Sequence, residues 1–129
     1  MFDFEKMLVY QRSEVLLGEI VEVTKKIPRG HRQLADQLLR STSSVCLNVA
    51  EGAGEFQPKE KARFYRMALR SATESASIIR ILHRLGIIPR HQYQACYDTL
   101  LEITKMLAKL ASSFAGQEKE KVRARRERD

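Results

Sequence analysis

The sequence has few residues that interrupt helices: three prolines and six glycines occur among its 129 residues. It also lacks any run that approaches the roughly 18 to 20 apolar residues of a membrane span. The opening residues, MFDFEKMLVYQRSE, carry acids where a signal peptide would have a basic end followed by an apolar stretch. These shortages predict long helices in a cytoplasmic protein with no membrane segment.

Residues that bind metals or form disulfides are equally sparse. Cys46 and Cys96 fall within apolar helical patterns, so we expect two buried thiols rather than a disulfide. His31, His83 and His91 are scattered, and neither a His-x3-His nor a Cys-x2-Cys spacing occurs. We therefore expect no metal ion and no other cofactor.

The residues that are present describe a helical domain. A hydrophobic content of 43% with 30% charged residues is typical of a globular protein, and this length suits one domain with its own core. Apolar residues recur at helical spacing in four segments joined by short connections, at residues 4–27, 31–53, 58–85 and 90–115. The pattern predicts an all-α fold, an antiparallel up-down four-helix bundle over residues 1–116.

The last residues, 117–129, read QEKEKVRARRERD and have little apolar surface between their charges. Such a segment cannot bury enough apolar area to hold a fixed position. We expect a charged, flexible C-terminal tail that is frayed helix or disorder.

Two of the predicted helices carry more apolar residues than one narrow core stripe requires. The additional residues are Leu16, Leu17, Cys96, Ile103 and Leu110. A helix of a monomeric bundle needs only one apolar face. A subunit interface and a wide core face both explain the excess.

The stretch SSVCLNVAEGAGEF, residues 43–56, contains Gly52 and Gly54 after an apolar helical run. A dinucleotide-binding loop needs a third glycine and a preceding strand, and a phosphate-binding P-loop needs a lysine followed by serine or threonine. Here a helix precedes the glycines. A left-handed cap at the end of that helix explains Gly52 or Gly54 better, and Gly86 provides a similar stop later in the chain.

Asn48 and Glu51 lie three residues apart on one face of the helix predicted at 31–53. A carboxylate near a helix C-terminus is unfavourable, so Glu51 is expected to pair with Arg63 or Arg66 of the next helix. The alternative, a general base, has no nucleophile or metal set beside it. In an antiparallel hairpin Glu74 lies too far away to form a glycosidase-like carboxylate pair with Glu51. We therefore expect no enzymatic activity.

The net charge of +7 is unevenly distributed along the chain. Residues 1–27 carry four bases and five acids, a balance of −1. Residues 59–90 carry eight bases and two acids, a balance of +6, and residues 117–129 carry six bases and four acids, a balance of +2. This distribution indicates an anionic partner, and nucleic acid is the first candidate.

One face of the helix predicted at 58–85 carries no acid and extends for about 37 Å. Like charges spaced four apart repel each other, a cost that an anionic partner would offset, and arginine suits phosphate oxygens. A structural or subunit-interface role for part of this face, or simple solvation, would also explain it. Its positions are Lys59, Arg63, Arg66, Arg70, Thr73, Ser77, Arg80 and Arg84. The candidate nucleic-acid contacts are the six cations of this face together with Arg123, Arg125 and Arg126.

Five stretches of the sequence form a recognisable combination: LVYQRS, KKIP, QLLRSTSSVCLNVAEGAGE, ARFYRMALRSATES and LHRLGII. Together they resemble the 23S rRNA intervening-sequence protein family, small bacterial four-helix-bundle proteins often encoded within insertions in large-subunit rRNA genes. The resemblance covers roughly residues 4–115. Its most specific piece is the run Asn-hydrophobic-Ala-Glu-Gly at residues 48–52.

The resemblance also assigns family positions outside that run. The family's aromatic-Gln pair corresponds to Tyr10 and Gln11, its upstream basic residue to Arg40, and its later Ser and Glu to Ser71 and Glu74. The expected structural polar cluster is Arg40, Asn48, Glu51 and Glu74.

Two residues depart from the family pattern. Arg70 stands where the family usually has glycine, which makes the acid-free face of the helix at 58–85 more basic than in a typical family member. Cys46 stands where proline is common, so the helix around it should be straighter.

The resemblance implies a bundle without established enzymatic activity. The chain is also similar to the accessory proteins of diversity-generating retroelements, which form pentameric rings and bind RNA and a reverse transcriptase. The first hypothesis is therefore a homo-oligomer that binds nucleic acid. A pentamer is the favoured assembly and RNA the favoured nucleic acid. We expect the protein to make few direct contacts with the bases. The alternative is a protein-interaction scaffold that docks an acidic partner. A nuclease would need a carboxylate–metal set that the sequence does not offer.

Overall fold

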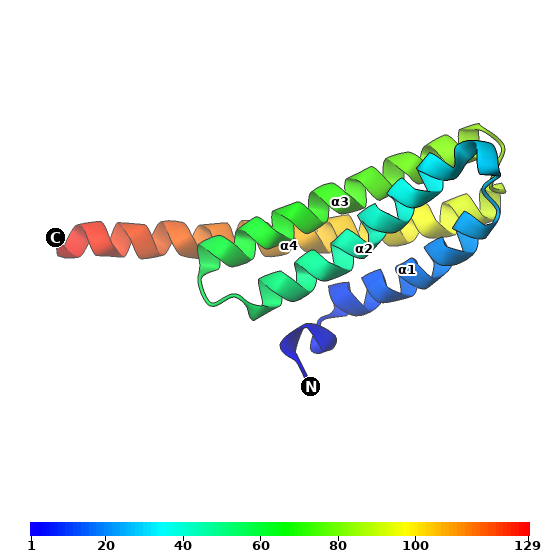
Figure 1. Ribbon diagram of the computed structural model, residues 1–129. Coiled ribbons are helices and arrows are strands. Elements are labelled where there is room, and N and C mark those ends of the chain that lie inside the picture. The colour runs from blue at the N-terminus through cyan, green and yellow to red at the C-terminus, as the bar shows by residue number, and fades with distance from the viewer.

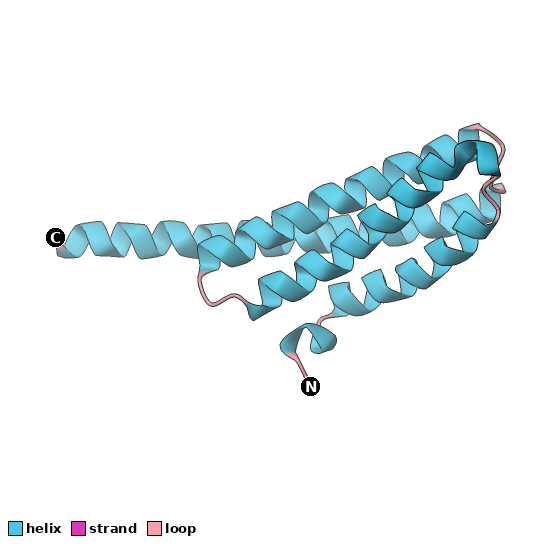
Figure 2. Cartoon of the chain, in the orientation of Figure 1, coloured by secondary structure: helices cyan, strands magenta, loops and turns pink.

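The computed structural model describes residues 1–129, and they form helices and loops without a strand (Figure 2). Consecutive helices run in opposite directions along one bundle (Figure 1). The prediction of an all-α four-helix bundle is confirmed. Its elements are η1 (Asp3–Lys6), α1 (Leu8–Lys25), η2 (Arg29–His31), α2 (Arg32–Gly54), α3 (Pro58–Arg84) and α4 (Arg90–Arg128).

Helix α3 packs along both α2 and α4, whereas α1 packs more extensively on α2 than on α4. The inward-facing residues of all four helices form one apolar core. Its largest fully buried side chains include Leu16, Ile20, Leu38, Ile79 and Leu107.

The apolar residues proposed for a subunit interface divide between core and surface. Leu16, Cys96 and Ile103 are buried, so these three belong to the core rather than to an interface. Leu17 and Leu110 are half-buried. A wide core face therefore explains most of the excess.

The two glycines of the 43–56 stretch do not form a left-handed cap. Gly86 is the one glycine with a positive φ, +74°. Gly52 is buried inside α2, and the helix continues to Gly54 before Glu55 takes an extended conformation. The expected cap at Gly52 or Gly54 is wrong, because a neighbouring side chain rather than the backbone conformation requires a glycine at position 52.

The expected stop at Gly86 is present. The N–H of Gly86 donates to the carbonyl of His83 at 3.0 Å, and the N–H of Ile87 donates to the carbonyl of Leu82 at 2.9 Å. These two bonds are those of a Schellman motif, in which the left-handed residue is almost free of strain when it is glycine.

Small hydroxyl groups let α2 and α3 approach closely. Ser41 and Thr42 of α2 are buried and lie 2.7 and 3.1 Å from the hydroxyl of Ser75 on α3. One turn away, Ser71 donates to Ser44 at 2.9 Å. Each hydroxyl finds a partner across the helix pair, so the buried polar atoms cost little.

The last helix extends past the bundle. Helix α4 continues to Arg128, and its final turns project alone from the body (Figure 1). The structure thus has helix where the sequence indicated frayed helix or disorder over residues 117–129. The flexibility of this segment stays a prediction.

Candidate nucleic-acid interface

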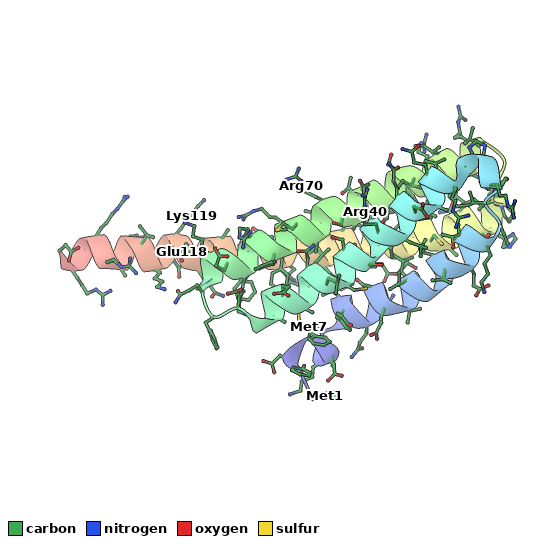
Figure 3. All side chains as sticks on the ribbon, in the orientation of Figure 1. Met1, Met7, Arg40, Arg70, Glu118 and Lys119 are labelled. Atoms are coloured by element: carbon green, nitrogen blue, oxygen red, sulfur yellow. The ribbon has the colours of Figure 1, made fainter.

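The cations of α3 lie on one outer side of the bundle, which we call the basic face: Lys59, Arg63, Arg66, Arg70, Arg80 and Arg84. All six side chains are exposed. Arg70, labelled in Figure 3, points away from the helices. With Thr73 and Ser77 between Arg70 and Arg80, the residues lie at three- and four-residue spacing, so the helical period places them on one side.

The opposite side of α3 explains this orientation. Its small and apolar side chains are buried against α2 and α4: Ala62, Tyr65, Ala68, Ala72, Ile79 and Leu82. Burial of that side leaves the charged positions facing water. The middle of the basic face is neutral, and there Thr73 donates its hydroxyl to the carbonyl of Leu69 at 3.0 Å.

Five cations of the basic face have no ion pair in the structure. Only Arg63 has one, with its Nη2 2.9 Å from Oε2 of Glu60, and its guanidinium lies 4.6 Å from the ring centroid of Phe64. Both partners of the Arg63–Glu60 pair are exposed, so the pair contributes little to stability. It does reduce the positive charge at this position.

The start of α3 adjoins α4. Lys59 and Arg66 line a hollow of about 300 Å³ together with Glu118 and Lys119 of α4. Glu118 makes no ion pair there. The sequence pattern did not identify this acid because Glu118 lies on a different helix from the basic face.

The C-terminal cations continue from this corner along the projecting part of α4. Arg123, Arg125 and Arg126 are exposed, and Arg123 donates its Nε to Glu127 at 3.1 Å. At the base of the projection, Lys121 donates a hydrogen bond to the side-chain oxygen of Gln57. The tail and the basic face therefore begin at the same end of α3.

The expected ion pair of Glu51 is absent. Glu51 is exposed, and it makes no ion pair with Arg63 or Arg66. Arg63 takes the nearer carboxylate of Glu60, one turn away on its own helix. Residues three apart on one helix are already neighbours, so this pair forms without any contact across the connection.

The free carbonyl groups at the C-terminus of α2 accept hydrogen bonds from a residue that the sequence pattern did not identify. Lys61 donates its ammonium to the carbonyls of Gly52 and Ala53, both at 3.1 Å, and lies 5.6 Å from the ring centroid of Phe114. A cation at the negative end of a helix is favourable. The available signal was a lysine one turn into the helix that follows a short connection.

The expected polar cluster is not assembled. Arg40 and Glu74 are exposed and make no side-chain hydrogen bond in the structure. Asn48 donates to the carbonyl and to the hydroxyl of Ser44, both at 2.9 Å. Of the four expected members, only Asn48 joins a hydrogen-bonded group, which includes the Ser44–Ser71 contact.

The two cysteines are free, and 6% of Cys46 and 1% of Cys96 is exposed. Burial, together with the charge of the nearby Glu14 carboxylate, raises the pKa of the Cys46 thiol to about 11. Burial and the charge of Glu19 likewise raise the pKa of the Cys96 thiol to about 11. Neutral buried thiols are poor nucleophiles.

No cluster of three or more histidine, cysteine, aspartate or glutamate side chains has the geometry to hold a metal ion. None of the helices combines the length and the apolar character of a membrane span.

These features define a small helical bundle with a strongly basic outer face. Residues 5–109 match the family model of the 23S rRNA-intervening sequence protein, and the chain belongs to this family. The match includes all of the basic face and stops before the projecting part of α4.

A solved structure has the same fold. It is the crystal structure of a protein of unknown function from the S23 ribosomal protein family of Bacteroides thetaiotaomicron VPI-5482. The two chains are 24% identical with a TM-score of 0.75, and the match covers 81% of this chain and 98% of that one. None of the curated proteins matches this sequence.

Proposed function

We propose that this protein is a non-enzymatic, homo-oligomeric bundle that binds nucleic acid, with RNA favoured, through phosphate contacts on the basic face. The observation that carries the proposal is the set of five exposed cations on α3 that have no ion pair. Four of the five are arginines, whose planar guanidinium groups bind phosphate oxygens in pairs.

The cations of the basic face repel one another. Arg66 and Arg70 lie four residues apart, as do Arg80 and Arg84, and like charges at this spacing destabilise a helix by a few tenths of a kcal/mol per pair. No carboxylate offsets these charges within ion-pair distance. A bound phosphate backbone would remove the repulsion and release its own counterions.

The proposed phosphate contacts would fix the position of the protein on the nucleic acid without recognising its base sequence. Phosphate contacts identify no bases, so sequence preference should be slight. The exposed Arg125 and Arg126 of the tail add positive charge beyond the body of the bundle.

For the assembly, we infer that a second copy of the chain covers an apolar groove between α1 and α4. The groove has a volume of about 390 Å³, and its apolar lining consists of Met7, Leu8, Val9, Met106 and Leu110. Leu8 is 54% exposed, and Val15, further along α1, is 63% exposed. Burial of such side chains favours association. The choice of a pentamer rests on the resemblance to retroelement accessory proteins.

A scaffold that docks an acidic partner protein is the second candidate. The resemblance to retroelement accessory proteins separately suggests a reverse transcriptase as a protein partner. The scaffold is favoured by the exposed apolar side chains Leu47 and Phe56, because phosphate contacts need no apolar surface. Copurification with and without nuclease treatment separates the candidates. A copurifying protein that resists nuclease favours the scaffold, and a nuclease-sensitive nucleic acid favours the first proposal.

The proposal is tested with Arg66→Gln, Arg70→Gln and Arg80→Gln combined, on single-stranded RNA of mixed sequence. Loss of three phosphate contacts should raise Kd by about tenfold or more near 100 mM salt. The matched control combines Lys6→Gln, Arg40→Gln and Lys105→Gln, which removes the same charge from exposed positions elsewhere. Equal Kd values for the two triple variants would remove the basic face as the binding surface.

A further inference from the structure

Two turns of the chain meet at one end of the bundle. The α1–α2 connection and the α3–α4 connection both lie at the end opposite the projecting part of α4 (Figure 1). Lys26 donates its ammonium to the side-chain oxygen of Gln92 at 2.9 Å and links the two turns. We call residues 25–36 and 83–92 the turn end.

Much of the positive charge of the chain lies there. The turn end contains six bases and a single acid, Asp36, which gives a balance of +5 in a chain whose net charge is +7. All three histidines of the protein also lie there. The six bases are Lys25, Lys26, Arg29, Arg32, Arg84 and Arg90.

Half of this charge has a structural explanation. Lys25 and Lys26 end α1, and Arg84 ends α3, where a cation interacts favourably with the helix dipole. Lys25 also pairs with Glu22 at 2.8 Å. These three residues would be expected in any helical bundle.

The other three bases have no such explanation. Arg29 and Arg32 precede and begin α2, and Arg90 begins α4, where a positive charge opposes the helix dipole. Neither α2 nor α4 has an acidic residue in its first turn. All three arginines are exposed and make no ion pair.

Two of these arginines share a hollow. Arg29 and Arg32 line a space of about 270 Å³ with Thr24 and Asp36, and apolar side chains complete the wall. Asp36 lies in the same hollow but is not within ion-pair distance of either guanidinium. The guanidinium groups are therefore free to bind another anion.

We propose that the turn end is a second phosphate-binding surface, which receives the nucleic-acid backbone where it leaves the basic face. The proposal rests on the proposed function. Arg84 belongs to both surfaces and Arg80 lies one turn before it, so the basic face and the turn end share a cation at the end of α3.

A polyanion fits these observations better than a small anion. The unpaired arginines come from two turns that are far apart in sequence, and only Arg29 and Arg32 share a hollow. An extended phosphate backbone contacts several separate cations at once, and each contact adds counterion release.

The test combines Arg29→Gln, Arg32→Gln and Arg90→Gln and measures binding to a single-stranded RNA of about 30 nucleotides at several salt concentrations. Three lost contacts should make the slope of log K against log salt shallower by about 2 and raise Kd about tenfold or more near 100 mM salt. The matched control is the triple variant of Lys6, Arg40 and Lys105, which should change Kd less than about twofold. Arg29→Lys, Arg32→Lys and Arg90→Lys combined should keep most of the parent slope, because the charge remains.

The outcomes separate this inference from the proposed function. If the parent binds with a steep salt dependence and the turn-end variant matches the control variant, the turn end is not a phosphate-binding surface while the basic face stands. If the parent binds no nucleic acid at any salt concentration, both fall. The turn-end variant should melt at or slightly above the parent temperature, because all three arginines are exposed and their charges oppose the helix dipoles.

Discussion

The ring of Tyr65 occupies the space that a side chain at position 52 would fill. A Cβ placed on Gly52 would lie 2.8 Å from Cε1 of Tyr65, and only 2% of Tyr65 is exposed. On its other side the ring packs against Phe114 of α4 at a centroid distance of 5.8 Å. Gly52 therefore lets α2 approach an aromatic side chain that also packs on α4.

Gly52→Ala should destabilise the fold. Tyr65 has little room to move, and overpacking of this kind costs about 1–3 kcal/mol, of which the better helix propensity of alanine recovers up to about 1 kcal/mol. Urea unfolding measures the difference. The matched control is Gly18→Ala in α1, where a Cβ would meet nothing within 4 Å and should stabilise by about 0.5–1 kcal/mol. Stabilisation by both substitutions would contradict the packing role of Gly52.

Lys61→Met should lower the free energy of unfolding by about 1 kcal/mol. Methionine keeps an apolar stem beside Phe114 but cannot donate to the carbonyls at the end of α2. Lys59→Met removes an exposed cation two residues earlier and should change stability by less than about 0.5 kcal/mol. Equal effects of the two substitutions on the unfolding midpoint would show that the capping contact contributes nothing.

Stability should fall as the pH rises from about 9 towards 11. The folded protein keeps the thiols of Cys46 and Cys96 protonated because their pKa values are raised from 9.0 to about 11, whereas the unfolded chain loses both protons earlier. Between these pH values the folded state binds more protons than the unfolded state. Each thiol therefore contributes to the free energy of unfolding below pH 9, and up to about 2 kcal/mol of this contribution is lost as the pH rises above 9. Unfolding measured at about pH 8 and pH 10.5 should show a smaller loss for Cys46→Ala combined with Cys96→Ala. An identical loss in that variant would exclude the thiols as its cause.

Removal of residues 117–129 should leave the bundle intact. The apolar core extends no further along α4 than Phe114, and the hydrogen bond from Lys121 to Gln57 lies at the surface. The free energy of unfolding should change by less than about 0.5 kcal/mol, while RNA affinity falls and remains salt-dependent. In the full chain, amide hydrogens of residues 118–128 should exchange faster than those of residues 100–114. Slow exchange throughout 118–128 would overturn the expected flexibility.

The sequence predicted the elements of the fold well because their signals are local. Helical spacing located the four helices, and Gly86 marked a helix stop that the structure contains. Such signals depend on a few neighbouring residues, so a single chain contains them in full.

Contacts between helices were predicted less well. Such contacts depend on which of several nearby groups a side chain reaches. Arg63 pairs with Glu60 and not with Glu51, and Lys61 reaches the end of α2. The turn end joins segments about 60 residues apart, so it appears only when the chain is folded. The row of cations on α3 was visible because it lies on one helix.

The sharpest test of phosphate binding by the basic face is the salt dependence of nucleic-acid binding by the unmodified protein. Each phosphate neutralised by a cation releases counterions, so the five unpaired cations of the basic face alone predict a slope of log K against log salt of roughly −4 to −5 on duplex and about −3 to −4 on single strands. Contacts at the turn end would make the slope on single strands steeper by about 2. Sequences of different composition should bind with similar affinity. A slope near zero, or no binding at low salt, would contradict the account and favour the protein-interaction scaffold.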